Sequence, residues 1–339
     1  MPNNKIQNSN VRKFNSGKGE YTDSPLQYGN RNVGADPCIC PNMFWHLILF
    51  FALLVSLSGC ATLTHNKNLS SHNSDAYAHY CMGVIHENKG EIGKAIGEYE
   101  ITIQADGAAI RPRYNLAKLY VSMGLIEPAA EQYRVLSELD RKNTRLSTVL
   151  GALYLHQGLM YSKQGDYERA IIFYKKLLKI YRSDLGYYYL GVAYERLGKI
   201  HCATKQFNLA IKLNPDCAET YNYLGYMHID RGKRLNKSIK LIKKALEIEP
   251  ENGYFADSLG WAYYKKGMLD QAMFQLERAV ELTKEEKDDS VIRDHLGDVY
   301  FQKKMYNEAI KQWKKAVELG AEDRKMIEEK IKNAGGETI

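Results

Sequence analysis

The chain lacks the short motifs by which catalytic and metal-binding proteins are usually recognised. None of its 339 residues falls in an HExxH, GxSxG or GxxxxGK[ST] motif, and its six cysteines include no CxxC pair. The sequence therefore predicts no catalytic residue, no metal site and no cofactor. We expect a protein that is not an enzyme and that has no small-molecule substrate.

The chain also lacks a strong excess of charge of either sign. It carries 47 basic and 40 acidic residues, and residues 60–339 alone carry 42 and 37. Nucleic-acid-binding domains usually show a clustered basic surface and a pI above about 9, whereas the pI of this sequence is about 8.8. No nucleic-acid partner is therefore expected.

Proline is scarce, and its distribution marks off the start of the chain. Four of the eight prolines lie within the first 41 residues, a segment rich in Asn, Ser and Gly that shows no hydrophobic periodicity. Such a composition is typical of disorder. Residues 1–42 are therefore predicted to be a disordered N-terminal extension.

A single long apolar run follows this extension. Residues 44–59 (FWHLILFFALLVSLSG) are nearly all apolar and are followed by Cys60, which is typical of a secretion signal. We predict a signal peptide at residues 43–59. Residues 57–60 (LSGC) resemble a bacterial lipobox. That resemblance implies cleavage before Cys60 and attachment of palmitate-type acyl chains there, and Ala61 after it implies sorting to the outer membrane.

Two alternatives stay open at this apolar run. A membrane-spanning helix needs about 20 apolar residues, so a 16-residue run that includes His46 and two serines favours a cleaved signal over an uncut inner-membrane anchor. The start of translation at Met1 or at Met43 also stays open, because a signal usually lies near the start of its chain. Residues 60–75 then form a polar tether behind the lipid-modified cysteine, with Ser74 or Asp75 as the expected N-cap of the first helix.

From residue 76 onward, one pattern recurs at a spacing near 34 residues. In its clearest copies a Leu-Gly pair, 224–225 or 259–260, precedes small residues such as Ala245 and Ala272. Glycine inside a helix costs about 1 kcal/mol relative to alanine, so these glycines need a packing reason, such as the close approach of a partner helix. Seven copies align on one small residue: Gly83, Ala117, Gly158, Gly191, Gly225, Gly260 and Gly297.

This pattern resembles the tetratricopeptide repeat (TPR) family. The resemblance implies two antiparallel helices in each repeat, stacked so that neighbouring repeats share a core. We therefore predict an all-α TPR solenoid of about seven helix-turn-helix repeats at residues 76–320, with a capping helix and tail at residues 321–339. An insertion of seven residues is expected near residues 143–149.

In TPR proteins the first helices line a concave groove that binds peptides or partner helices. Carried over position by position, the resemblance implies a groove for a protein or peptide partner. Its predicted lining is Tyr188, Arg196, Asn222, Tyr226, Asp257, Trp261 and Tyr264, with Glu195, Asp294 and Asp298 beside them. Aromatic and Arg side chains are typical of binding hot spots. The alternative is that the aromatic residues pack between neighbouring first helices.

The remaining cysteines and histidines are predicted to be structural. Cys202 and Cys217 flank most of one helix, which places them roughly 20 Å apart at 1.5 Å per residue, too far for a disulfide. We therefore expect free thiols, including Cys81. His86 and His228 occupy a position at which other repeats have tyrosine, which favours a packing role.

The predicted function is that of a lipid-anchored, periplasm-facing TPR scaffold that assembles an envelope complex. In this prediction the chain meets the bilayer through acylated Cys60 and meets its partner in the groove. Two alternatives are an accessory subunit of a glycan- or polysaccharide-processing enzyme system and an adapter anchored in the inner membrane.

Overall fold

The computed structural model describes residues 71–229, 231–232, 234–283 and 289–336. Those residues form helices joined by short turns, with no strand among them. The predicted N-terminal extension, signal peptide, Cys60 and most of the tether lie outside the described residues, and so do residues 337–339. The predicted tether overlaps the first described helix, which begins at Ser71. The N-cap prediction at Ser74 or Asp75 is therefore wrong, because both residues lie inside that helix.

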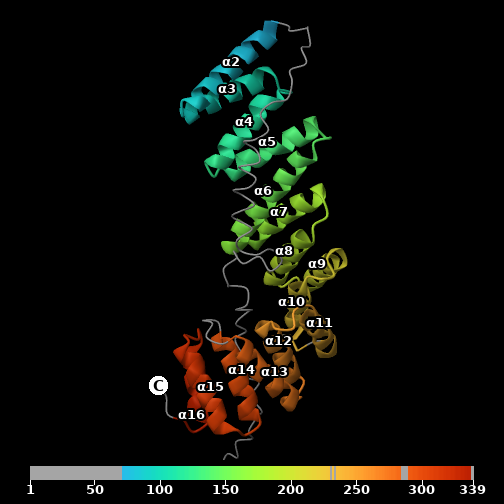
Figure 1. The fold of residues 1–339 in the computed structure, drawn as a ribbon, viewed down its shortest axis with the longest axis vertical. Helices are drawn as coiled ribbons and strands as arrows, with labels where there is room; N and C mark the ends of the chain where they lie inside the picture. The colour runs from blue at the N-terminus through green and yellow to red at the C-terminus, as the bar shows by residue number, and fades with distance from the viewer. Residues whose placement is uncertain (1–70, 230, 233, 284–288, 337–339) are drawn as a thin grey trace, which may run out of the picture. The chain divides into compact units, whose positions relative to one another are not determined.

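The helices follow one another as antiparallel pairs, stacked in chain order (Figure 1). The first helices of the pairs are α2 Ser71–Asn88, α4 Ile110–Ser122, α6 Thr144–Lys163, α8 Asp184–Arg196, α10 Ala218–Ile229, α12 Gly253–Lys265 and α14 Asp289–Gln302. The second helices are α3 Ile92–Ala105, α5 Ile126–Leu139, α7 Tyr167–Ile180, α9 Ile200–Leu213, α11 Leu235–Ile248, α13 Leu269–Leu282 and α15 Tyr306–Glu318. The seven predicted repeats and the all-α solenoid are confirmed.

The glycines of the first helices allow close approach of a large side chain from the second helix. A Cβ added at Gly297 would lie 2.4 Å from Nε1 of Trp313, and one added at Gly158 would lie 2.3 Å from Cε1 of Tyr174. Real Cβ atoms do not approach other heavy atoms so closely. The packing reason predicted for Gly225 and Gly260 is therefore confirmed, since their added Cβ atoms would meet Ile242 and Leu276 at 2.7 and 2.6 Å.

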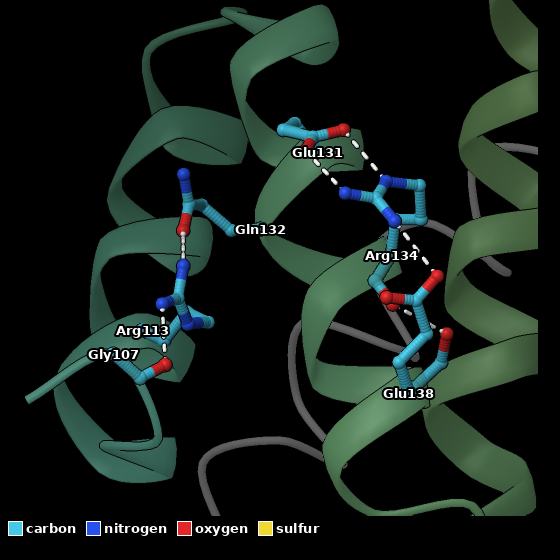
Figure 2. Close-up of polar contacts among 7 residues, drawn as sticks. Gly107, Arg113, Glu131, Gln132, Arg134 and Glu138 are labelled. Atoms are coloured by element: carbon cyan, nitrogen blue, oxygen red, sulfur yellow. Dashed lines mark hydrogen bonds and ion pairs between the residues drawn. The ribbon is translucent and has the colours of Figure 1, made fainter. Parts of the chain in front are cut away.

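A polar brace repeats between the two helices of several pairs. Arg113 on α4 is 8% exposed, and its guanidinium donates to Gln132 Oε1 on α5 at 2.9 Å and to the carbonyl of Gly107 at 2.8 Å. Figure 2 shows Arg113 lying between these two partners. The same 19-residue spacing joins His79 to Glu98 and Arg293 to Gln312. These braces pair polar groups across the interface between the two helices, although Nε of Arg113 is buried without a hydrogen-bond partner.

The predicted insertion near residues 143–149 lengthens a helix rather than a loop. α6 has 20 residues, and its leading turns place Leu146 and Leu150 in the buried cluster that includes Tyr133 and Leu136 of α5. α5 packs against these added turns, and Met160 near the end of α6 is 46% exposed.

The solenoid ends in the predicted capping helix. α16, Arg324–Asn333, buries Ile327 and Ile331 and presents charged residues elsewhere. A polar outer face of this kind closes the apolar end of a repeat array.

Candidate functional site

The predicted groove residues lie on consecutive first helices that contact one another. α10 packs on α12, and α12 packs on α14. Tyr188 of α8 reaches α10, where its ring lies 5.8 Å from the ring of Tyr223. The structure therefore brings the C-terminal first helices together as one surface, which we call the first-helix face: α8, α10, α12 and α14.

An aromatic stack lies on this face between α12 and α14. The Trp261 ring is stacked on Tyr264 at 4.9 Å and on His295 at 4.0 Å, with interplanar angles of 17° and 16°. The Lys265 ammonium lies 4.5 Å from the Trp261 ring centroid. Trp261 and Tyr264 are partly exposed. Stacked rings with a nearby cation form a rigid, partly apolar surface that suits a binding hot spot.

His295 holds this stack in place through Asp257. The two side chains lie on neighbouring first helices, with Nδ1 of His295 2.8 Å from Oδ1 of Asp257. Burial by itself would lower the pKa of His295, but the charges of Asp257, Asp294 and Asp298 outweigh it and raise the pKa. Asp257 is 0% exposed. It therefore positions the stack from below rather than standing at the surface beside it.

A second ion pair joins α14 to the capping helix. Lys330 Nζ lies 2.7 Å from both Asp294 Oδ1 and Asp298 Oδ1, and Trp313 Nε1 donates to Asp298 at 3.2 Å. Burial and the neighbouring Asp294 raise the pKa of Asp298, while Lys330 opposes that rise. The two aspartates predicted beside the groove are thus engaged by α16.

A third polar cluster surrounds Glu195 at the end of α8. Glu195 is 4% exposed, and its carboxylate lies 3.5 Å from Arg231 Nη2 and 3.8 Å from Arg196 Nε. Tyr223 donates to it at 3.4 Å. Burial raises the pKa of Glu195, and the two arginines counteract that rise. The predicted groove residue Arg196 therefore neutralises a buried acid.

Tyr188 follows the packing alternative more closely than the groove prediction. Its ring contacts Tyr189, Phe207 and Tyr223 at 5.3, 5.9 and 5.8 Å. Burial raises the pKa of Tyr188 well above its ordinary value of 10. Tyr188 thus belongs to an aromatic cluster that joins α8, α9 and α10.

Three buried polar atoms on α10 and α12 have no hydrogen-bond partner: Oδ1 of Asn222, Nε2 of His228 and Oγ of Ser258. Asn222 is itself a predicted groove residue, and Ser258 directly follows another, Asp257. Asn222 and Asp257 each lie three residues before the glycine of their repeat, so they are equivalent positions in neighbouring repeats. Ser258 and His295 each lie two residues before that glycine and are equivalent in the same way. An unsatisfied buried acceptor costs about 1–3 kcal/mol. Tyr226, at the position of Trp261, is partly exposed near Asn222 in the chain. A donor supplied by a bound partner would satisfy Asn222.

Sequence reasoning missed His295 and Lys330, although a signal for both exists. An acidic residue three positions before the repeat glycine is present in α12 and α14, as Asp257 and Asp294. His295 pairs with Asp257 and Lys330 pairs with Asp294, at separations of 38 and 36 residues along the chain. Comparing acidic and basic residues between consecutive repeats would have found both pairs.

Other sites are sparse within the described ranges. There, no three His, Cys, Asp or Glu side chains gather as metal ligands. Cys81, Cys202 and Cys217 are thiols outside any disulfide, as predicted. None of the described helices is both long and apolar enough to cross a membrane. An open depression of about 590 Å³ lies over α14 and α15, lined by residues such as Arg293 and Lys311, and it includes none of the predicted groove residues.

Comparison with known proteins agrees with the repeat architecture. Tetratricopeptide repeat families match residues 149–214 and residues 257–286 and 292–322. A TPR repeat-containing protein of Pseudomonas aeruginosa is 25% identical over 205 residues, which are 60% of this chain and 34% of that protein. Mitochondrial import receptor subunit TOM70 of Mus musculus is 21% identical over 176 residues, 52% of this chain and 29% of that protein. This chain thus spans about a third of the length of these curated relatives.

A solved structure of a TPR protein also matches part of the chain. The crystal structure of a thermophilic TPR protein in Thermus thermophilus is 21% identical, covers 54% of this chain and 98% of its own, and has a TM-score of 0.45. The family matches and the paired-helix geometry point the same way. The chain contains tetratricopeptide repeats, and its described helices form a TPR solenoid.

Proposed function

We propose that this chain is a lipid-anchored TPR scaffold that binds a protein or peptide partner on the first-helix face and so helps to assemble an envelope complex. One observation carries the binding proposal: the partly exposed Trp261–Tyr264 stack lies one repeat from the unsatisfied Oδ1 of Asn222. Stacked solenoid repeats offer extended binding surfaces. TOM70, a relative over part of the chain, is by name a receptor subunit, which supports a binding role.

The chemistry of this face describes the partner. Trp261 and Tyr226 favour an apolar or aromatic side chain, since such rings bury large area at little cost in conformational entropy. Asn222 favours a backbone or side-chain N–H donor. A peptide segment carrying both features, either extended or helical, meets these requirements.

Photo-crosslinking tests this binding proposal. A photoreactive amino acid replaces Trp261 or Tyr226 in cells, and the captured protein is identified by mass spectrometry. Phe274 on α13, 63% exposed, is the matched control because it is an exposed aromatic residue on a second helix. We expect one envelope protein to be captured at 261 and 226 but not at 274. Equal capture at all three positions would contradict a specific first-helix face.

The anchoring part of the proposal rests on the sequence of residues 43–60. The lipobox-like LSGC and the polar stretch after it support an outer-membrane lipid anchor that faces the periplasm, with an inner-membrane anchor as the alternative. Cys60→Ala should abolish incorporation of labelled fatty acid and leave the precursor at its full size. If the Cys60→Ala variant were labelled and processed to the same size as the natural protein, Cys60 would not be the anchor.

A further inference from the structure

α2 exposes an apolar face that five of the other six first helices bury. In α2, Met82 directly precedes the repeat glycine Gly83, and Ile85 lies two positions after that glycine. Met82 is 43% exposed and Ile85 is 42% exposed. In α6 the equivalent residues are Gln157, which is buried, and Met160, which is 46% exposed. The corresponding residues in α4, α8, α10, α12 and α14 are 0–6% exposed: Leu116 and Leu119, Leu190 and Ala193, Leu224 and Met227, Leu259 and Ala262, Leu296 and Val299.

A preceding second helix covers this face elsewhere in the array. Leu116 and Leu119 of α4 share a buried cluster with Ala95 and Tyr99 of α3, and Leu224 and Met227 of α10 share one with residues of α9. No second helix precedes α2 among the described residues. Among the described residues, the α2 face therefore lacks the covering helix that α4 and α10 have.

The face has a charge pattern that is complementary to itself. Asp75, Ala78, Met82, Ile85 and Lys89 follow one another at spacings of three and four residues, so they form one stripe along the helix. The two charged residues lie seven positions on either side of Met82, with the acid Asp75 near the start of α2 and the base Lys89 directly after its last residue. Asp75 and Lys89 are both exposed, and at 1.5 Å per residue they lie roughly 20 Å apart, so they cannot pair within one helix.

We propose that a second copy of this chain occupies the α2 face, with the two α2 helices antiparallel about Met82. In that register Asp75 of each copy lies opposite Lys89 of the other. Met82 meets its own counterpart at the centre of the pair. Opposite charges at both ends of the stripe favour this antiparallel register.

The chain segment just before α2 is a poor alternative occupant. Residues 61–70 (ATLTHNKNLS) hold only two large apolar residues, Leu63 and Leu69. The second helices that cover α4, α8 and α10 have 14 residues each and carry an apolar stripe. A ten-residue polar segment offers neither that length nor that stripe.

Disulfide trapping of the full chain in its membrane tests the proposal. Met82→Cys is made in a Cys81→Ser background, and the matched control is Phe274→Cys in the same background. We expect mild oxidation to give a covalent dimer through position 82 and none through position 274. A chain that stays monomeric at position 82, or that dimerises equally at both positions, would overturn the proposal.

A charge swap tests the register. Lys89→Glu places two acids opposite each other, and the trapped fraction should fall about fivefold if each exposed ion pair contributes about 0.5 kcal/mol. Adding Asp75→Lys to Lys89→Glu restores opposite charges across the pair, so trapping should return. Failure of the double variant to recover would rule out this register. A photoreactive amino acid at Met82 that captured residues 61–70 or a different protein would show another occupant and overturn the proposal.

Discussion

At the residue scale, the glycines of the first helices set the distance between the two helices of a repeat. Gly297 allows α14 to approach the ring of Trp313, which is only 2% exposed and has little room to move. Gly297→Ala should therefore destabilise the fold by about 2 kcal/mol, because overpacking a core costs about 1–3 kcal/mol. Urea unfolding measures the change.

Gly97 provides the matched control for that substitution. It also lies inside a helix, α3, but nothing lies within 4 Å of an added Cβ. Gly97→Ala should therefore stabilise the protein by about 0.5–1 kcal/mol through helix propensity alone. If both alanines changed the free energy of unfolding in the same direction, the close-approach explanation would fail.

A buried histidine makes the stability of the protein depend on pH. His228 is 5% exposed, and burial together with Arg234, Lys237 and Arg231 lowers its pKa to about 4. The folded protein thus keeps His228 neutral between about pH 6.5 and pH 4, whereas the unfolded chain protonates this histidine near pH 6.5. The contribution of neutral His228 is fully present above about pH 6.5 and is lost as the pH falls toward 4, by about 2–3 kcal/mol in total.

Replacing His228 isolates this contribution. His228→Tyr introduces the residue that other repeats carry at this position, such as Tyr263 and Tyr300. The slope of unfolding free energy between pH 6.5 and 4 should become shallower than in the natural protein. His201→Tyr, at an exposed site on α9, should leave the slope unchanged. An unaltered slope in the His228 variant would show that another group is responsible.

At the element scale, the capping helix depends on one buried cation. Lys330 neutralises Asp294 and Asp298, and its side chain is 17% exposed. Lys330→Met leaves two neighbouring acids without their cation, so we expect a loss of about 3 kcal/mol near neutral pH. Because protonation relieves the repulsion, and because burial and Asp294 raise the pKa of Asp298, the loss should shrink at acidic pH.

A double variant separates charge from packing at this helix. Adding Asp298→Asn to Lys330→Met removes one of the uncompensated acids. Thermal unfolding should then recover part of the lost stability. No recovery would mean that Lys330 supports α16 through its aliphatic stem rather than through its charge.

Individual elements differed in how far the sequence alone could predict them. The helix pairs follow from Gly225, Gly260 and their alanine partners, because close packing leaves a local and repeated pattern. The form of the insertion before α6 could not be predicted, since seven added residues suit either a loop or two more helical turns. The contact of α5 with Leu146 and Leu150 decides in favour of the helix.

Contacts between repeats were harder to predict than contacts within them. Asp257 and His295 lie 38 residues apart and meet only because α12 packs on α14. Asp257 was therefore predicted as a surface residue of the groove, although it lies buried under the aromatic stack. Trp261 and Tyr264 are partly exposed, and their role in partner binding stays a prediction.

At the scale of the whole molecule, three regions have separate proposed roles. We propose that the first-helix face binds a protein or peptide partner, that the face of α2 binds a second copy, and that Cys60 holds the chain at the membrane. Each role rests on different residues. Trp261→Ala should therefore weaken partner capture and leave trapping through position 82 unchanged, which crosslinking of both sites in one variant can measure. Loss of both together would indicate a general folding defect.

Hydrogen exchange of the full chain, alone and with its captured partner, tests the central claim most directly. Binding on the first-helix face should add protection in α10, α12 and α14 and leave α11 and α13 of the same repeats little changed. Asn222 and Tyr226 lie on α10, and Trp261 lies on α12. Protection confined to α11 and α13, or absent from α10 and α12, would contradict binding on the first-helix face.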